Sequence, residues 1–309
     1  MRQKVILDCD PGHDDAINIM LACASPELEL MAVTTTYGNV SLERTTYNAR
    51  VIREMIGHDF PICAGAELPL MRNRLSAESC HGASGLDGPD LPKPVRDVEP
   101  MHAVNFIIES VFRYPHQIKI LPTGPLTNLA LAMRLEPKII PLIQEVVLMG
   151  GSVDVGNWSP AAEYNILCDP HAARVVFESA APVTMFGLNI THQAIASPAR
   201  VDAFRKLGTR NGEFAAVLLE FFREHHEQRY GWDGGALHDP MTAAYLIKPE
   251  LFEFRDMHVA VETQEGSSYG RTNCDYWRVL EAQKRSKVGV KVDADGFFAL
   301  LTERIARFP

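Results

Sequence analysis

Short apolar runs alternate with amphipathic stretches along most of the chain. Apolar runs of roughly four to eight residues are typical of buried strands, whereas apolar residues spaced three or four apart indicate helices. Strands are predicted at residues 4–10, 29–38, 118–124, 145–151 and 182–189. Helices are predicted at residues 14–23, 42–56, 126–135, 170–179, 198–207 and 212–230, and another opens at residue 238. This alternation is typical of an α/β fold with a mainly parallel central sheet and helices on both faces.

Polar, glycine-containing segments follow the predicted strands. They are DCDPGHDD (8–15), YGN (37–39), PTGPLTN (122–128) and MGGSVDVGN (149–157). Ligands of parallel α/β sheets bind outside the carboxyl ends of the strands, so we expect a site where these segments meet. Residues 81–100 are rich in glycine and proline and are predicted to form a long loop of the kind that covers binding sites. No repeat or linker interrupts the pattern, and we expect a single domain over residues 1–309.

Composition narrows the range of partners. The chain has 309 residues, 46% of them hydrophobic, and a net charge of −9 without any long Lys/Arg run, which argues against binding to nucleic acid. No signal-peptide pattern opens the sequence, and no window approaches the roughly 20 apolar residues of a membrane helix. The six cysteines contain no CxxC pair and fit a reducing compartment. We therefore expect a cytoplasmic protein that binds neither nucleic acid nor membranes.

The closest cluster of candidate functional residues lies around Pro11 and Gly12, where Asp8, Asp10, Asp14 and Asp15 fall within eight residues. Neighbouring carboxylates repel one another unless a cation is bound, and carboxylate oxygens favour Ca²⁺ or Mg²⁺. The first pair ends a strand and the second begins a helix, so the turn between them can direct all four toward one ion. Capping of the helix by Asp14 or Asp15 explains one carboxylate but not four.

DCDPGHDDA resembles the DxDPGxDDA signature of the inosine–uridine-preferring nucleoside hydrolases. YGN, HGxxGL, PTGPLTNLA, LMGG, AEYNILCDP and HDP recur in the order and approximate spacing of that family, across almost the whole chain. Two residues depart from the pattern: Cys9 stands where the family usually has Thr, and His13 where it usually has an aliphatic residue. The resemblance implies a single-domain, Rossmann-like α/β fold. It also implies hydrolysis of the N-glycosidic bond of ribonucleosides (EC 3.2.2 class) in nucleoside catabolism and purine or pyrimidine salvage, and assembly into homodimers or homotetramers.

The resemblance also implies a calcium cofactor and specific residue roles. Ca²⁺ would bind the side chains of Asp10, Asp15 and Asp239 and the backbone carbonyl of Thr123. Asp10 would also be the general base that takes a proton from the calcium-bound water. His238 would lie near the leaving base as a second catalytic residue. The residues expected to hold the ribose and the water are Asp14, Asn39, Asn157, Glu163 and Asn165.

Several of these residues have a structural explanation from the sequence alone. Asp169 and Asp239 both precede a proline, and both suit the N-cap of a helix, so only the resemblance separates a cap from a metal ligand. Asn39 lies beside a turn signal and could belong to an Asx turn. Met149 and Tyr164 are candidate substrate contacts that also suit the core.

The nucleobase is expected against the predicted helix 212–230. Phe222, His226 and Tyr230 recur every four residues and therefore share one helix face, with Trp232 expected near the mouth of the pocket. Tyr and His combine ring stacking with polar groups, which suits the edge of uracil or cytosine. His81, on the lid-like loop, is expected to close over the base.

This region most resembles the pyrimidine-preferring bacterial branch of the family, although that branch tends to carry small or amide residues where Phe222 and His226 stand. We expect a preference for uridine and cytidine. The alternative is a purine-preferring or non-specific enzyme, in which His238 or His226 protonates the leaving purine.

Two other classes of function compete with this hypothesis. LDCD at a strand end fits the DxD motif of aspartyl phosphatases of the haloacid-dehalogenase type. That class also needs a later Ser/Thr at a strand end, a Lys and a distal acidic pair, whereas here Asp14 and Asp15 follow the motif immediately and the nearest candidate, Lys119, lies within a strand. A non-catalytic calcium- or ribose-binding module would not need Asp10 as a surplus carboxylate.

Overall fold

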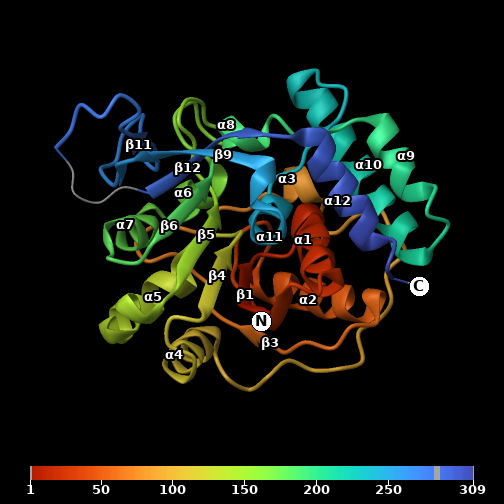
Figure 1. Cartoon of the computed structure of the whole chain (residues 1–309), viewed down its shortest axis with the longest axis horizontal. Helices are drawn as coiled ribbons and strands as arrows, with labels where there is room; N and C mark the ends of the chain where they lie inside the picture. The colour runs from red at the N-terminus through yellow and green to blue at the C-terminus, as the bar shows by residue number, and fades with distance from the viewer. Residues whose placement is uncertain (1, 282–285, 309) are drawn as a thin grey trace.

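An eight-stranded sheet runs through the middle of the molecule in the order β3-β2-β1-β4-β5-β6-β12-β9 (Figure 1). The computed structural model describes residues 2–281 and 286–308. All neighbouring strands pair in parallel except β9, which is antiparallel to β12 at the edge. The strands are β1 (Gln3–Cys9), β2 (Leu28–Thr35), β3 (Ile62–Ala64), β4 (Ile118–Pro122), β5 (Glu145–Met149), β6 (Val183–Phe186), β9 (Phe252–Met257) and β12 (Ser286–Val292).

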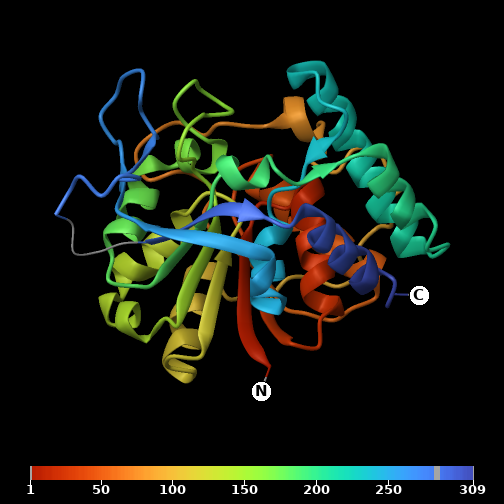
Figure 2. The same cartoon turned by 45° about the horizontal axis from the view of Figure 1, so that its top comes forward.

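Helices cover both faces of this sheet, as Figures 1 and 2 show. One face packs against α1 (His13–Ala24), α2 (Leu42–Ile56), α11 (Pro240–Ile247) and α12 (Ala294–Ile305), with α9 (Pro198–Arg205) and α10 (Arg210–Tyr230) outside them. The other face packs against α4 (Ala103–Arg113), α5 (Thr127–Leu135) and α7 (Pro170–Glu178). Each face has its own hydrophobic core, so the sheet is buried on both sides.

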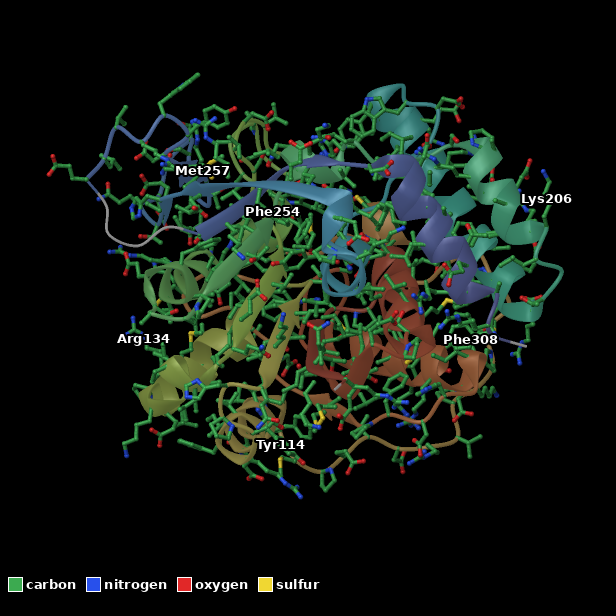
Figure 3. All side chains as sticks on the ribbon, in the orientation of Figure 1. Tyr114, Arg134, Lys206, Phe254, Met257 and Phe308 are labelled. Atoms are coloured by element: carbon green, nitrogen blue, oxygen red, sulfur yellow. The ribbon has the colours of Figure 1, made fainter. Side chains whose placement is uncertain are left out.

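Shorter elements fill the connections. They are α3 (Glu78–His81), α6 (Tyr164–Cys168), α8 (Leu188–Thr191), the 3₁₀ helices η1 (Pro137–Leu142) and η2 (Pro249–Leu251), and the antiparallel pairs β7 (Ile195–Ala196) with β8 (Gly235–Ala236) and β10 (Val259–Val261) with β11 (Thr272–Cys274). Side chains fill the space between the layers, while the exposed residues Arg134 and Lys206 lie on opposite flanks (Figure 3).

The local sequence accounts for the elements nearest the site. Val5, Ile6 and Leu7 of β1 are fully buried, because a central parallel strand is covered on both faces. α2 begins at Ser41, whose side chain accepts a hydrogen bond from the backbone N–H of Arg44, and ends at Gly57 in the left-handed conformation.

The predicted fold class is confirmed: the structure is a single α/β domain with a mostly parallel sheet. Each predicted strand and helix is present, with ends shifted by a few residues at most. The loop predicted from His81 to Pro100 is confirmed except at its first residue, which closes α3. In the part of the chain that the structure describes, none of the helices combines the length and hydrophobicity needed to cross a bilayer.

Candidate active site

The polar segments that follow β1, β2 and β4 converge at one edge of the sheet. The chain turns from β1 to β2 on one side and later returns as β4 on the other side of β1, which makes this edge a topological switch point, where α/β sheets bind ligands. The backbone N–H of Thr123 donates to the carbonyl of Asp8 over 2.9 Å, and that of Asn39 donates to the carboxylate of Asp10 over 2.6 Å. These bonds connect the three segments directly.

A pocket with about 600 Å³ of space, partly open to solvent, lies above these segments. Asp10 and Asp15 do not line it; both are buried and contact residues that do. The sequence-predicted residues that line the pocket are Asp14, Asn39, His81, Thr123, Met149, Asn157, Glu163, Tyr164, Asn165, Phe222, His226, Tyr230, His238 and Asp239.

Three buried carboxylates form a group that can hold a metal ion. One oxygen from each of Asp14, Asp15 and Asp239 lies within 4.8 Å of the others. Burial raises the pKa of Asp14 to about 7 and that of Asp15 to about 6, and at Asp14 the neighbouring carboxylate adds to the rise. The pKa of Asp239 rises well above its usual range for the same two reasons. Without a cation, this site therefore disfavours the ionised carboxylates that it gathers.

Asp10 occupies a socket built by backbone and by glycines. One of its oxygens accepts the N–H of Asn39, whereas Oδ1 is buried without a hydrogen-bond partner among the described residues. Gly38 and Gly124 flank the carboxylate, and a Cβ at either position would overlap it. Burial and the nearby Asp15 raise the pKa of Asp10 well above its usual range. A buried, unpaired carboxylate oxygen is costly unless a cation or a proton donor meets it.

Capping accounts for part of the acidic motif. Asp15 Oδ2 accepts the backbone N–H of Gly12 at the start of α1, while its Oδ1 accepts the hydroxyl of Thr123 over 2.7 Å. Asp169 caps α7 by accepting the N–H of Ala172. Asp239 precedes α11 in the same sequence context, but its side chain makes no capping bond. The structure therefore distinguishes the helix cap, Asp169, from the candidate metal ligand, Asp239, which the sequence alone could not do.

The expectation that all four clustered aspartates turn toward one ion is wrong for Asp8. Its Oδ1 accepts hydrogen bonds from the Thr34 hydroxyl at 2.7 Å and from the Asn128 side chain at 2.8 Å, and Asp8 does not line the pocket. The spacing of the motif could not show this, because alternation along a strand would place residues 8 and 10 on the same face, and Asp10 lies beyond the end of β1, where that alternation no longer holds. Asp239, more than 200 residues away, joins the carboxylate group instead.

Glu163 and Asn165 are held at the other wall by short bonds. Glu163 caps α6 and accepts backbone N–H groups from Gly151, Asn165 and Ile166 at 2.8–3.0 Å. Burial raises the pKa of Glu163 to about 7. The side-chain amide of Asn165 donates to the carbonyl of Thr123 over 2.9 Å. This bond ties the wall to the backbone of the acidic end of the pocket.

Asn39, Asn157 and Tyr164 also have structural partners. The amide of Asn39 donates to the carbonyl of Asp10, Asn157 accepts the backbone N–H of Tyr164, and the Tyr164 hydroxyl donates to Gly38 over 2.6 Å. Asn39 thus bridges two strand ends instead of closing an Asx turn. These hydrogen bonds hold the three side chains in place along the pocket. Their contacts with the ribose hydroxyls stay a prediction.

The opposite wall is aromatic. The Phe222 and His226 rings are 4.4 Å apart and the His226 and Tyr230 rings 5.4 Å, which confirms that they share one face of α10. Trp232 is not a lining residue, but it stacks on two residues that are, Tyr230 at 4.7 Å and His226 at 5.9 Å. His238 Nδ1 lies 2.8 Å from the Thr191 hydroxyl, and burial holds the pKa of His238 well below its usual range.

Five lining residues were not predicted. The Arg229 guanidinium donates to the carbonyl of Asn157 and lies 5.9 Å from the centre of the Trp158 ring, so it closes one side of the pocket. Each missed residue lies within a few positions of a predicted one, but spacing alone gives no signal that its side chain turns inward. They are Ala77, Cys80, Trp158, His225 and Arg229.

Comparison with known proteins identifies related enzymes. Residues 5–299 match the family model described as inosine-uridine preferring nucleoside hydrolase. The pyrimidine-specific ribonucleoside hydrolase RihA of Photobacterium profundum is 42% identical over the whole of both chains. RihB of Escherichia coli K12, also a pyrimidine-specific ribonucleoside hydrolase, is 40% identical over 98% of this chain and 96% of its own.

Solved structures give the same result. A purine-preferring ribonucleoside hydrolase from Gardnerella vaginalis superimposes with a TM-score of 0.92 at 35% identity, over 98% of both chains. The plant nucleoside hydrolase PpNRh1 also reaches 0.92, at 32% identity, over 99% of this chain and 100% of its own. The family and enzyme class expected from the sequence are confirmed, and the chain belongs to the inosine-uridine preferring nucleoside hydrolase family.

Proposed function

We propose that this protein hydrolyses the N-glycosidic bond of ribonucleosides and releases ribose and the free base. The observation that carries the proposal is the unpaired, buried Oδ1 of Asp10, which lies beside a buried carboxylate group at the acidic end of the pocket. Cleavage of an N-glycoside develops positive charge on the sugar, and a carboxylate-rich wall stabilises that charge.

The residues present fit a calcium ion. Asp10, Asp15 and Asp239 and the carbonyl of Thr123 would offer hard oxygen ligands. Asp15 and Asp239 meet in one group with Asp14, and the mutual repulsion of these carboxylates and of nearby Asp10 favours a divalent cation. When bound, Ca²⁺ supplies the positive charge that keeps these groups ionised and polarises the oxygens around it. The Thr123 carbonyl already accepts one bond from Asn165 and has a second lone pair.

The protein's own residues divide the remaining work. Asp10 accepts the proton of the attacking water, and the backbone N–H of Asn39 fixes its other oxygen, so the base is oriented before the ligand arrives. Asp14, Asn39, Asn157, Glu163 and Asn165 hold the ribose. His238, fixed by Thr191, lies beside the departing base.

We further propose that pyrimidine nucleosides are the preferred substrates. The two relatives named as pyrimidine-specific are 40–42% identical, whereas the purine-preferring neighbour is 35% identical. The α10 face of Phe222, His226 and Tyr230 narrows the base end of the pocket with rings and polar edges. We expect kcat/KM for uridine or cytidine to exceed that for inosine and adenosine.

A substrate panel with free ribose as the readout tests both proposals. Uridine, cytidine, inosine and adenosine are compared with p-nitrophenyl phosphate, whose hydrolysis would instead favour a phosphatase. Exhaustive chelation should abolish ribose release and added Ca²⁺ should restore it. A preference for inosine of about tenfold over both pyrimidines would contradict the base preference alone. Tight calorimetric binding of uridine without hydrolysis would contradict the catalytic role.

A further inference from the structure

Two buried histidines join the first turn of α1 to the end of α3 at the pocket. Nδ1 of His13 lies 3.1 Å from Nδ1 of His81, and Nε2 of His13 lies 2.9 Å from the backbone carbonyl oxygen of Asp87. The His13 ring is 1% exposed and stacks on Phe221 with 4.6 Å between ring centroids. His81 lines the pocket, whereas His13 does not.

The partners of His13 determine where its proton lies. A carbonyl oxygen only accepts, so Nε2 of His13 carries a hydrogen. Burial disfavours a charged imidazolium, and a neutral ring with that hydrogen has an unprotonated Nδ1. The 3.1 Å contact then requires the proton to be on Nδ1 of His81, which leaves Nε2 of His81 unprotonated. Over residues 2–281 and 286–308, no protein group forms a hydrogen bond with that Nε2.

A second contact favours the opposite tautomer. The backbone N–H of His13 points at Nδ1 of His81 over 3.4 Å, which suits an unprotonated Nδ1. That contact is the longer of the two. In addition, an unprotonated Nδ1 on His81 would place its lone pair opposite the lone pair of His13 Nδ1, 3.1 Å away. The side chain at position 13 therefore decides the tautomer. With an aliphatic residue there, the backbone N–H would be the partner that remains.

We propose that His13 holds His81 in the Nδ1–H tautomer, so that Nε2 of His81 accepts a hydrogen bond from a ring N–H of the nucleobase, such as N3–H of uracil. The inference rests on the proposed function, because it assigns recognition within the same pocket. His13 is a positioning residue and touches no ligand. Phe222 lies 5.5 Å from the His81 ring, and an acceptor at Nε2 that a bound base covers without a hydrogen bond is costly.

The first test reads the tautomer directly. ¹⁵N NMR of histidine-labelled protein, with His81→Gln to assign the His81 signals, should show Nδ1–H in the wild type and Nε2–H in His13→Leu. Phe221→Leu is the matched control: it removes the stacking on His13, keeps the contact between the histidines and should keep the tautomer. An Nε2–H tautomer in the wild type, or an unchanged one in His13→Leu, would overturn the assignment. The wild-type spectrum decides even if a variant fails to fold, and it requires no turnover, so its failure is distinct from failure of the proposed function.

The second test reads recognition of the base. His13→Leu should lower kcat/KM for uridine about tenfold, the cost of one unpaired buried group, and should leave kcat/KM for 3-methyluridine within about threefold. Phe221→Leu should change both substrates by the same factor. Equal losses for both substrates in His13→Leu would overturn recognition of N3–H.

Discussion

At the scale of single residues, one oxygen of Asp10 is fixed by Asn39, which lines the pocket, and the other has no partner within the described residues. Asp8 also has one unpaired oxygen, but its other oxygen is bound by Thr34 and Asn128, which do not line the pocket. Asp10→Asn keeps the size but removes the proton acceptor, and kcat should fall at least about 10²-fold, the low end for general acid–base catalysis. The measurement is ribose release at saturating Ca²⁺. Asp239→Asn is the matched control, since it weakens the same carboxylate group without removing the base, and added Ca²⁺ should restore much of its activity. Activity of Asp10→Asn within about threefold of wild type would leave Asp10 a structural role only.

Two roles are proposed for the side-chain amide of Asn165: it supports the calcium site and it binds the ribose. Its Nδ2 donates to the Thr123 carbonyl, so Asn165→Ala should weaken calcium binding as well as ribose recognition. We expect a higher Ca²⁺ concentration for half-maximal activity and, at saturating Ca²⁺, a larger loss with uridine than with 5′-deoxyuridine. Equal losses with the two substrates would contradict contact with the 5′-hydroxyl.

At this scale, the sequence predicted site residues correctly where a residue type had one chemical explanation. It failed where the role of a residue depends on the direction in which its side chain points. Clustered aspartates and an ordered set of motifs led to Asp10, Asp15 and Asp239. The same reasoning counted Asp8, which Thr34 and Asn128 hold outside the carboxylate group. Arg229 was missed because the charged face of an exposed helix gives no sign that one guanidinium turns to the pocket.

At the scale of elements, the loops at the carboxyl ends of the strands are shaped by glycines that make room for Asp10. A Cβ at Gly124 would overlap the Asp10 carboxylate, although the backbone there suits any residue. Gly124→Ala should therefore lower kcat by about tenfold or more by displacing the base, with little change in Tm.

Gly57 is the matched contrast to Gly124. It ends α2 in the left-handed conformation with nothing near its Cβ, so Gly57→Ala should cost about 1 kcal/mol of stability and leave kcat unchanged. Thermal melts and uridine kinetics on the two variants make the comparison. Loss of activity in proportion to loss of Tm in both would contradict the socket described for Asp10.

The elements that sequence reasoning missed lie mostly at the edges and near the end of the chain. β12, with sequence SKVGVKV, alternates apolar and charged residues, and β9 is a partly exposed edge strand, so neither carries the continuous apolar run that identifies the central strands. α4 and α12 have apolar faces, but they do not follow one of the strands that were predicted, so the alternation of strands and helices did not reveal them.

At the scale of the whole molecule, the buried carboxylates link stability to pH. The pKa of Asp15 rises from 3.8 to about 6 and that of Asp14 from 3.8 to about 7 on folding without metal, so between these values the folded state binds more protons than the unfolded state. The stability that these two carboxylates contribute to the calcium-free protein should therefore be fully present at about pH 4 and should be lost as the pH rises to about 7. Buried histidines such as His238, whose pKa lies well below its usual range, act in the opposite direction, so the carboxylate contribution is read from the difference between calcium-free and calcium-loaded protein. Ca²⁺ should reverse this loss, because it binds the ionised carboxylates of the folded state only.

Thermal melts of calcium-free and calcium-loaded protein across this pH range test the linkage. The difference in Tm between the two forms should grow with pH. A difference that is constant, or largest at pH 4, would contradict a calcium site made of these carboxylates.

The carboxylate group also spans nearly the whole chain, since Asp14 and Asp15 begin α1 while Asp239 precedes α11. During synthesis, a chain still attached to the ribosome carries the first two aspartates long before the third has emerged from the exit tunnel. Such a chain offers only a weak, flexible pair of ligands, because the third is missing and the fold is incomplete. A calcium ion at the proposed site would therefore play no part in the early stages of folding, and it would bind only after the strands from β1 to β6 have been made.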